Sequence, residues 1–157
     1  MAAGTERARR AIVVGVDGSE GGSAALRFAA EEAAVRRAPL RVVCAWSVPA
    51  SVYSVGMLPD TETTASFRQS AEAVAEAAVT EAKRLAPDVE CVAVTPEAPP
   101  GVALVDESKG AALVVVGTRG HGMLSTLLLG SVSQHVVHHA HCPVVVIRRA
   151  DGEAAES

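Results

Sequence analysis

Two glycine-rich segments of the 157-residue chain contain the residue types that bind phosphate. Residues 16–23 read Val-Asp-Gly-Ser-Glu-Gly-Gly-Ser, and residues 117–122 read Gly-Thr-Arg-Gly-His-Gly. Because glycine has no Cβ, backbone N–H groups in such segments can approach phosphate oxygens closely. Residues 130–133 precede a predicted helix, whose unpaired N–H groups and positive dipole end favour an anion. The pattern predicts an anion-binding cradle, although glycines that merely turn the chain and a serine that merely caps a helix would produce it too.

Neither glycine-rich segment matches the common motifs of nucleotide hydrolases and dehydrogenases. The chain contains no G-x-x-x-x-G-K-[ST], and the glycines of the first segment do not fit G-x-G-x-x-G. Near the cradle, Asp17 and His121 form the only candidate acid–base pair, and residues 117–133 contain no carboxylate and no lysine. The sequence therefore predicts a binding and regulatory site with slow hydrolysis or none, and we assign no catalytic residue.

Histidines and cysteines offer two further possibilities for chemistry, both of which we interpret as structural. His135, His138 and His139 have the i, i+3 and i+4 spacing of helical metal ligands. We nevertheless expect structural or solvent-exposed roles for them and no protein-bound metal. The three cysteines are scattered without a C-x-x-C pair, which is typical of buried thiols in a reducing cytoplasm.

The composition excludes several classes of function. Apolar residues make up 49% of the chain, charged residues 20% and aromatic residues 3%, and the formal net charge is −4. An acidic chain with few aromatic rings lacks the basic surface and the stacking platform of nucleic-acid-binding proteins. No apolar run reaches the roughly 18 residues that cross a bilayer, so we expect no membrane association. The length predicts a single domain.

The elements that must position the cradle alternate along the chain. Five short apolar runs, mostly β-branched, predict strands that are covered on both faces and hence a mainly parallel sheet. Helical patterns separate the strands, so the predicted order is β-α-β-α-β-α-β-α-β. In a doubly wound sheet the ligand lies outside the carboxyl ends of the strands, where the strand order reverses. The predicted strands are residues 11–16, 40–46, 89–94, 113–117 and 144–147.

Periodicity and capping signals predict four helices, at residues 23–37, 67–85, 102–109 and 131–140. The second has apolar residues at steps of three or four from Phe67 to Leu85. The fourth begins with Ser-Val-Ser-Gln, a capping-box sequence that makes Ser131 the N-cap. Residues 48–61 form a long connection, either a functional lid or a mobile loop. We expect one domain at residues 10–149, with flexible tails at 1–9 and 150–157.

The glycine-rich segments resemble the nucleotide-binding motif of the universal stress protein family. The likeness rests on Gly117-x2-Gly120-x9-Gly130-Ser131, on Val-Val-Gly-Val-Asp-Gly-Ser at 13–19 and on His-Cys-Pro-Val at 141–144. It covers roughly residues 10–149 and implies a doubly wound α/β fold with five parallel strands in the order 3-2-1-4-5, usually as a homodimer. One departure is Ala98, which stands where the family often has glycine.

The resemblance implies a role for each part of the cradle. Asp17 would face the nucleoside, and adenine would lie near the second strand, around Val43 and Ala45. From its place at the end of that strand, we expect Trp46 to lie beside this adenine pocket. From the residues alone, Asp17 could instead form an Asx turn, and His121 could be an exposed loop residue. The implied nucleotide-binding residues are Asp17, Gly18, Ser19, Val43, Ala45, Gly117, Arg119, Gly120, His121, Gly130, Ser131, Val132 and Ser133.

The resemblance implies a stress-response regulator that binds ATP, or else ADP or AMP, with Mg²⁺ held through the phosphates. The alternatives are a weak ATPase or nucleotidyl-handling enzyme, a flavodoxin-like FMN binder and a nucleotide-free scaffold. Few aromatic residues are available to sandwich a flavin, which weakens the FMN alternative. The last strand, Val144–Ile147, would be an apolar edge with little protection, so we expect it to form the homodimer interface.

Overall fold

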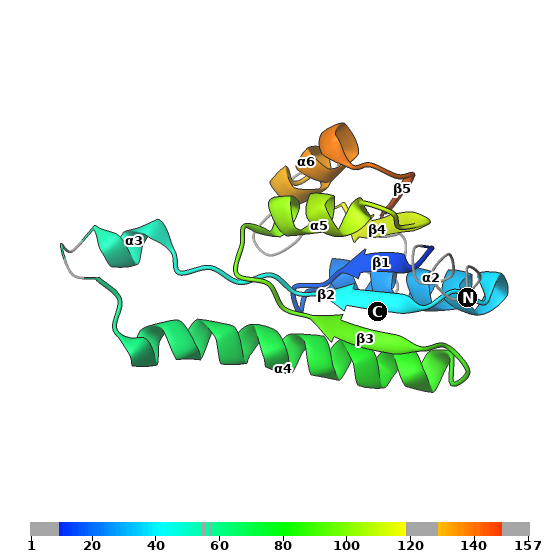
Figure 1. The fold of residues 1–157 in the computed structure, drawn as a ribbon, viewed down its shortest axis with the longest axis horizontal. Helices are drawn as coiled ribbons and strands as arrows, with labels where there is room; N and C mark the ends of the chain where they lie inside the picture. The colour runs from blue at the N-terminus through cyan, green and yellow to red at the C-terminus, as the bar shows by residue number, and fades with distance from the viewer. Residues whose placement is uncertain (1–9, 55, 57, 119–128, 149–157) are drawn as a thin grey trace, which may run out of the picture.

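A five-stranded parallel sheet in the order β3-β2-β1-β4-β5 forms the centre of the molecule (Figure 1). The structure is a computed structural model that describes residues 10–54, 56, 58–118 and 129–148. The order reverses between β1 and β4, which are neighbours in the sheet. The predicted α/β class and strand order are therefore confirmed. The strands are β1 Ile12–Gly15, β2 Leu40–Val43, β3 Cys91–Val94, β4 Leu113–Gly117 and β5 Val144–Ile147.

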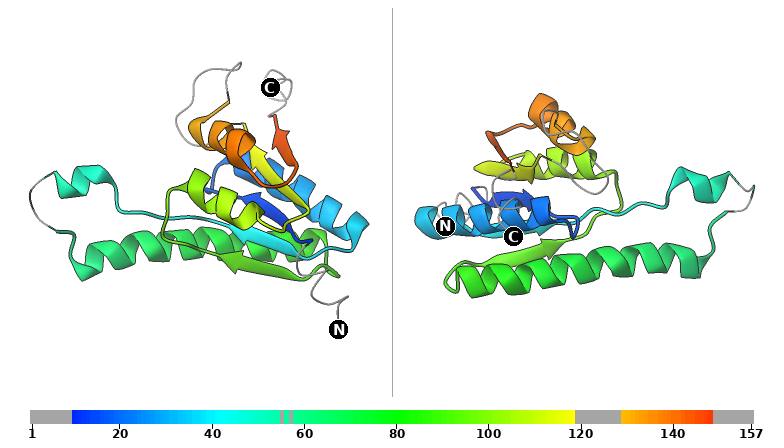
Figure 2. Two further views of the ribbon diagram at one scale, coloured as in Figure 1. Left: turned by 45° about the horizontal axis from the view of Figure 1, so that its top comes forward. Right: turned by 180° about the vertical axis from the view of Figure 1, so that it is seen from behind.

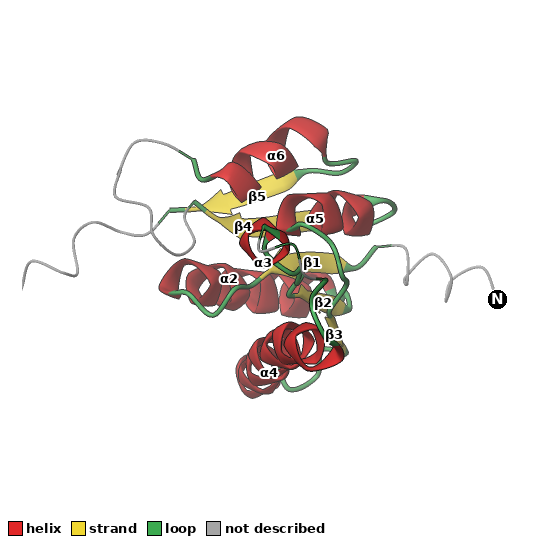
Figure 3. Ribbon diagram, turned by 90° about the vertical axis from the view of Figure 1, so that its left-hand side faces the viewer, coloured by secondary structure: helices red, strands yellow, loops and turns green. Residues whose placement is uncertain are grey.

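Helices cover both faces of the sheet (Figure 3). On one face, α2 (Glu20–Arg36) and α4 (Thr61–Leu85) pack against Ile12 and Val14 of β1. On the other face, α5 (Pro100–Ser108) and α6 (Ser131–His139) cover Val13. Successive residues of β1 thus enter different cores, which explains why the strand is apolar throughout instead of alternating.

The first helix begins earlier than its predicted start at residue 23. Ser19 is the N-cap of α2, and its hydroxyl accepts a hydrogen bond of 3.2 Å from the Gly22 N–H. Gly21 and Gly22 are therefore the second and third residues of the helix and not part of a loop. The N-cap bond outweighs the low helix propensity of the two glycines.

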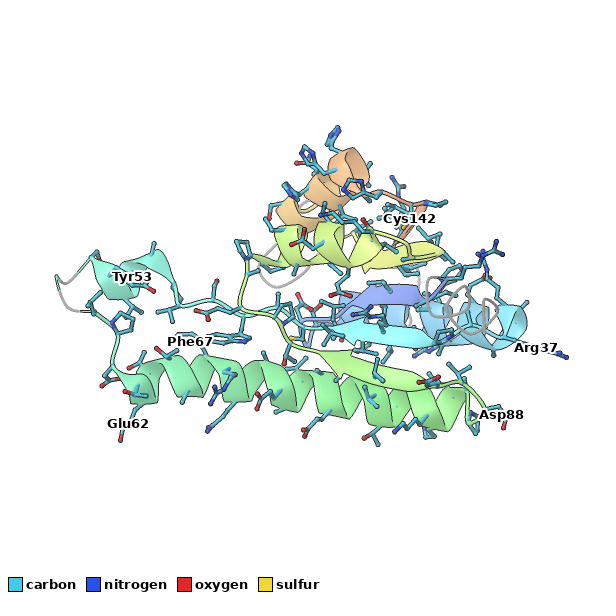
Figure 4. The ribbon with its side chains drawn as sticks, in the orientation of Figure 1. Arg37, Tyr53, Glu62, Phe67, Asp88 and Cys142 are labelled. Carbon is cyan, nitrogen blue, oxygen red and sulfur yellow. The ribbon has the colours of Figure 1, made fainter. Side chains whose placement is uncertain are left out.

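The long connection of residues 48–61 is partly helical. It contains the short helix α3 (Ala50–Tyr53), and α4 begins at Thr61, well before Phe67, with Asp60 as its N-cap. The α3 segment and the first turns of α4 project as an arm beyond the sheet (Figures 1 and 2). Tyr53 and Phe67 lie on this arm, away from the centre of the sheet (Figure 4).

The predicted capping box of the fourth helix is wrong. Gly130, in extended backbone conformation, is the N-cap of α6, and no side chain caps the helix. Ser131 is instead the first helical residue, where its side chain is exposed. Within the described ranges, no helix has both the length and the apolar character that crossing a bilayer requires.

Candidate functional site

A pocket opens at the carboxyl edge of the sheet, beside the point where the strand order reverses. Its lining comes from the ends of three strands, from the first turn of α2, and from α5 and α6. It encloses about 120 Å³, less than the roughly 300 Å³ of a small complete ligand site, so a larger ligand must extend out of it. The lining residues are Gly15, Val16, Asp17, Ser19, Gly22, Val43, Ala45, Pro100, Leu104, Val116, Gly117 and Val132.

Hydrogen bonds hold the polar side of this pocket in place. The Asp17 carboxylate accepts hydrogen bonds from the Ser19 N–H, at 2.9 Å, and from the Ser19 hydroxyl. The same hydroxyl accepts the N–H of Gly22, so Asp17, Ser19 and the start of α2 form one network. Gly18 has a φ of +82°, a left-handed conformation that favours glycine. Both predicted interpretations of Asp17 are thus compatible, because the Asx-type turn itself brings the carboxylate to the pocket.

Gly117 has a packing role that the motif alone does not reveal. A Cβ at this position would lie 2.8 Å from the carbonyl oxygen of Gly21 in α2. A close approach between the end of β4 and the first turn of α2 therefore requires glycine here. Packing alone therefore requires glycine at position 117 of the predicted phosphate motif, whether or not a ligand also approaches this residue.

The start of α6 is joined to the end of β4. The Gly130 N–H donates to the Thr118 carbonyl at 2.7 Å, and the buried Ser133 hydroxyl donates to the carbonyls of Gly130 and Thr118 at 3.0 and 3.3 Å. The Ser133 side chain thus joins the start of α6 to the end of β4, and its hydroxyl proton is shared between two backbone carbonyls. The first-turn N–H groups that follow Gly130 have no acceptor within the helix, and Val132 lines the pocket. An anion beside α6 would therefore meet backbone donors first.

The apolar side of the pocket comes from β2 and α5. Val43 and Ala45 line it, together with Pro100 and Leu104, two residues that we did not predict from the sequence. Leu104 packs closely against Gly15 of β1, because a Cβ at Gly15 would lie only 2.8 Å from the Leu104 side chain. The only available signal for Leu104 was its place on the buried face of a predicted helix.

The predicted position of Trp46 is wrong. Its ring packs with Cys44 and with Ala71 and Ala75 of α4, on the opposite face of the sheet from Ala45. Side chains alternate along an extended segment, so neighbours in sequence face opposite sides. Its indole N–H donates to the Thr95 carbonyl at 3.2 Å, which leaves the ring outside the pocket lining.

The electrostatic effect of Asp17 reaches the opposite face of the sheet. Burial raises the pKa of the Cys44 thiol, and the Asp17 carboxylate raises it further because a second negative charge nearby is unfavourable. The three cysteines are unpaired in the structure. Cys44 is therefore a protonated, buried thiol and not an activated nucleophile.

Three of the predicted site residues, Arg119, Gly120 and His121, lie outside the described residues. Of the others, Asp17, Ser19, Val43, Ala45, Gly117 and Val132 line one pocket, and Gly18 adjoins it. Gly130, Ser131 and Ser133 belong to the adjoining start of α6. Among the residues that the structure describes, no group of three His, Cys, Asp or Glu side chains could hold a metal ion.

Curated universal stress proteins are similar to this chain over most of its length. A universal stress protein of Mycolicibacterium smegmatis is 37% identical over 158 residues, which cover 93% of this chain and 50% of that protein. Universal stress protein Rv2623 of Mycobacterium tuberculosis is 38% identical over 144 residues, which cover 89% and 48%. The chain thus spans about half the length of the curated relatives that it matches.

Solved structures show the same fold. The universal stress protein of Archaeoglobus fulgidus in complex with dAMP has a TM-score of 0.66 at 26% identity, covering 88% of this chain and 97% of that one. A sequence model of the Universal stress protein family matches residues 8–148. On this match, which extends over most of the sequence, the chain belongs to the universal stress protein family.

Proposed function

We propose that this chain binds an adenine nucleotide in the pocket between β1 and β4, with ATP as the ligand. The observation that carries the proposal is the pocket itself: it lies at the switch point of the sheet and joins an apolar side to a carboxylate and a helix N-terminus. The related Archaeoglobus fulgidus protein, solved with dAMP, supports the same ligand class.

Each part of the nucleotide fits a different part of the pocket. The base would lie against Val43, Ala45 and Leu104, where the lining is apolar. Asp17 would accept hydrogen bonds from the ribose hydroxyls. Because the pocket is small, the phosphates would extend outward to the first turn of α6, where Ser131 is exposed and backbone N–H groups favour an anion.

We further propose that the protein acts as a stress-response regulator with slow hydrolysis or none, and not as an efficient ATPase. Asp17 is the one titratable residue among the described residues that line the pocket. Mg²⁺ would accordingly be held mainly through the phosphates. Release of phosphate from ATP at the turnover rates typical of enzymes, about 1 s⁻¹ or faster, would favour the ATPase alternative.

We also propose that the chain is located in the cytoplasm and that it forms a homodimer through β5. The four residues of β5 are all partly exposed, and β5 lies at one end of the sheet order. Val145→Lys with Ile147→Lys should convert a dimer to monomer in light scattering, because both side chains would place like charges across a two-fold axis. Val92→Lys, on the opposite edge strand β3, is the matched control. A wild-type monomer would refute the dimer, and an unchanged dimer in the double variant would place the interface elsewhere.

Neighbouring residues of β2 provide the test of the nucleotide site. Ala45→Leu adds three carbons on the pocket side, and we expect ATP affinity to fall at least about tenfold, or 1.4 kcal/mol. Trp46→Phe, on the opposite face, should leave affinity unchanged. Calorimetry on both variants, with circular dichroism to check folding, gives the answer. Equal affinity in wild type and in folded Ala45→Leu protein would place the base elsewhere.

A further inference from the structure

A second groove, next to the nucleotide pocket, is lined by residues of α2 and α4. These two helices lie on the face of the sheet away from α5 and α6 (Figure 3). The groove encloses about 620 Å³, which lies within the roughly 300–1,000 Å³ of small-molecule sites. It meets the nucleotide pocket at Val16, Ser19 and Gly22, which line both.

Short side chains keep the groove open. Ala73 and Ala77 of α4 and Ser23 of α2 are exposed along it. Longer apolar side chains, including Leu26 and Val74, line it more deeply. The groove therefore offers apolar surface that a hydrocarbon chain could cover, so each buried CH₂ group should tighten binding.

Charge differs between the two ends of the groove. At the end near Leu85, Arg27 of α2 and Glu81 of α4 contribute to the lining. The Glu81 carboxylate accepts hydrogen bonds of 2.6 and 2.9 Å from Arg84, so this end has two guanidinium groups and one carboxylate. Among the described residues, no charged side chain lines the other end, at the start of α2. An elongated ligand with one anionic end would thus be oriented, its anion toward Arg27.

We propose that this groove binds a free medium-chain fatty acid. The hydrocarbon chain would lie along Leu26 and Val74, and the carboxylate would lie beside Arg27. The size of the groove, its apolar lining and its single cationic end together select this ligand class over a cationic amphiphile. The proposal does not depend on nucleotide binding.

The only tryptophan of the chain provides the readout. Val74 lines the groove but not the nucleotide pocket, and it packs against the same apolar cluster as Trp46. A chain that contacts Val74 should therefore change the fluorescence of Trp46. Filling the nucleotide pocket should have a smaller effect, because the ring lies on the opposite face from Ala45.

The test titrates the protein with hexanoate, octanoate and decanoate below their micelle concentrations, following Trp46 fluorescence and, independently, equilibrium dialysis of labelled decanoate. We expect saturable binding that tightens about fourfold for each added CH₂ group, and weaker binding of decyltrimethylammonium. Arg27→Gln should weaken decanoate two- to fivefold, as expected for an exposed ion pair. No saturable binding, or equal binding of the cationic amphiphile, would overturn the proposal.

Two leucine variants of α4 locate the bound chain. Ala77→Leu fills the groove and should weaken decanoate at least about tenfold. Thr80→Leu adds the same side chain to an exposed position that does not line the groove, and it should bind as wild type does. Circular dichroism establishes that both are folded. Wild-type binding in folded Ala77→Leu protein would show that the ligand lies elsewhere.

Discussion

Replacing Gly117 by alanine tests the close contact between the backbone of β4 and that of α2, beside the pocket. The added Cβ would lie 2.8 Å from the Gly21 carbonyl oxygen and 2.9 Å from the carbonyl carbon, against 3.4 Å for ordinary contact. Both obstructing atoms are backbone, so β4 and α2 must separate by about 0.6 Å, the difference between 3.4 and 2.8. Overpacking of this kind costs about 1–3 kcal/mol. At a midpoint of about 2 kcal/mol, the melting temperature of a chain this size should fall by roughly 4–8 °C.

Thermal unfolding followed by circular dichroism measures this change, and Gly15→Ala is the matched control. At Gly15 the new Cβ also comes within 2.8 Å of an atom, but that atom is the terminal Cδ1 of Leu104, which can rotate away. We therefore expect a clearly smaller fall in melting temperature for Gly15→Ala. A melting temperature within about 1 °C of wild type for Gly117→Ala, or a larger loss in the control, would refute the close-contact argument.

Three further predictions concern other hydrogen bonds and charges. Ser108→Ala removes a fully buried hydroxyl that accepts from the His141 N–H at 2.9 Å, so urea unfolding should show a loss of about 1–2 kcal/mol, whereas the exposed Ser70→Ala should be neutral. Hydrogen bonds from Thr63 hold the pKa of the Asp60 carboxyl below its ordinary value, so the cap stabilises α4 at neutral pH and is lost as pH falls through the lowered pKa of the folded state. Asp60→Ala should speed hydrogen exchange in the first turn of α4 at pH 7, and the difference should vanish in acid. Asp17→Asn should lower the pKa of Cys44 and speed its alkylation at fixed pH, read by mass spectrometry, while Cys91 reacts as in wild type; equal Cys44 rates would contradict the predicted coupling.

The parts of the fold that were predictable are those fixed by local pattern. The β-branched runs predict all five strands, because strands covered on both faces contain few polar residues. The strand order came from the resemblance, since periodicity does not specify which strands are neighbours. The start of α2 was missed because Gly21 and Gly22 suggest a loop, whereas the Ser19 cap makes them helical.

Features that depend on contacts distant in sequence could not be predicted. The need for glycine at position 117 arises from the backbone of Gly21, almost a hundred residues away. Leu104 reaches the pocket only because α5 crosses that end of the sheet. The side of Trp46 follows from strand alternation, which the sequence contained and our prediction did not apply.

Equilibrium dialysis of labelled ATP against the purified chain, first stripped of bound nucleotide, tests the central claim most directly. The account predicts saturable uptake of one nucleotide per chain, displaced by unlabelled ATP and reduced in Ala45→Leu. Equal label on both sides of the membrane at a protein concentration of about 100 μM, where even weak specific binding is measurable, would contradict it.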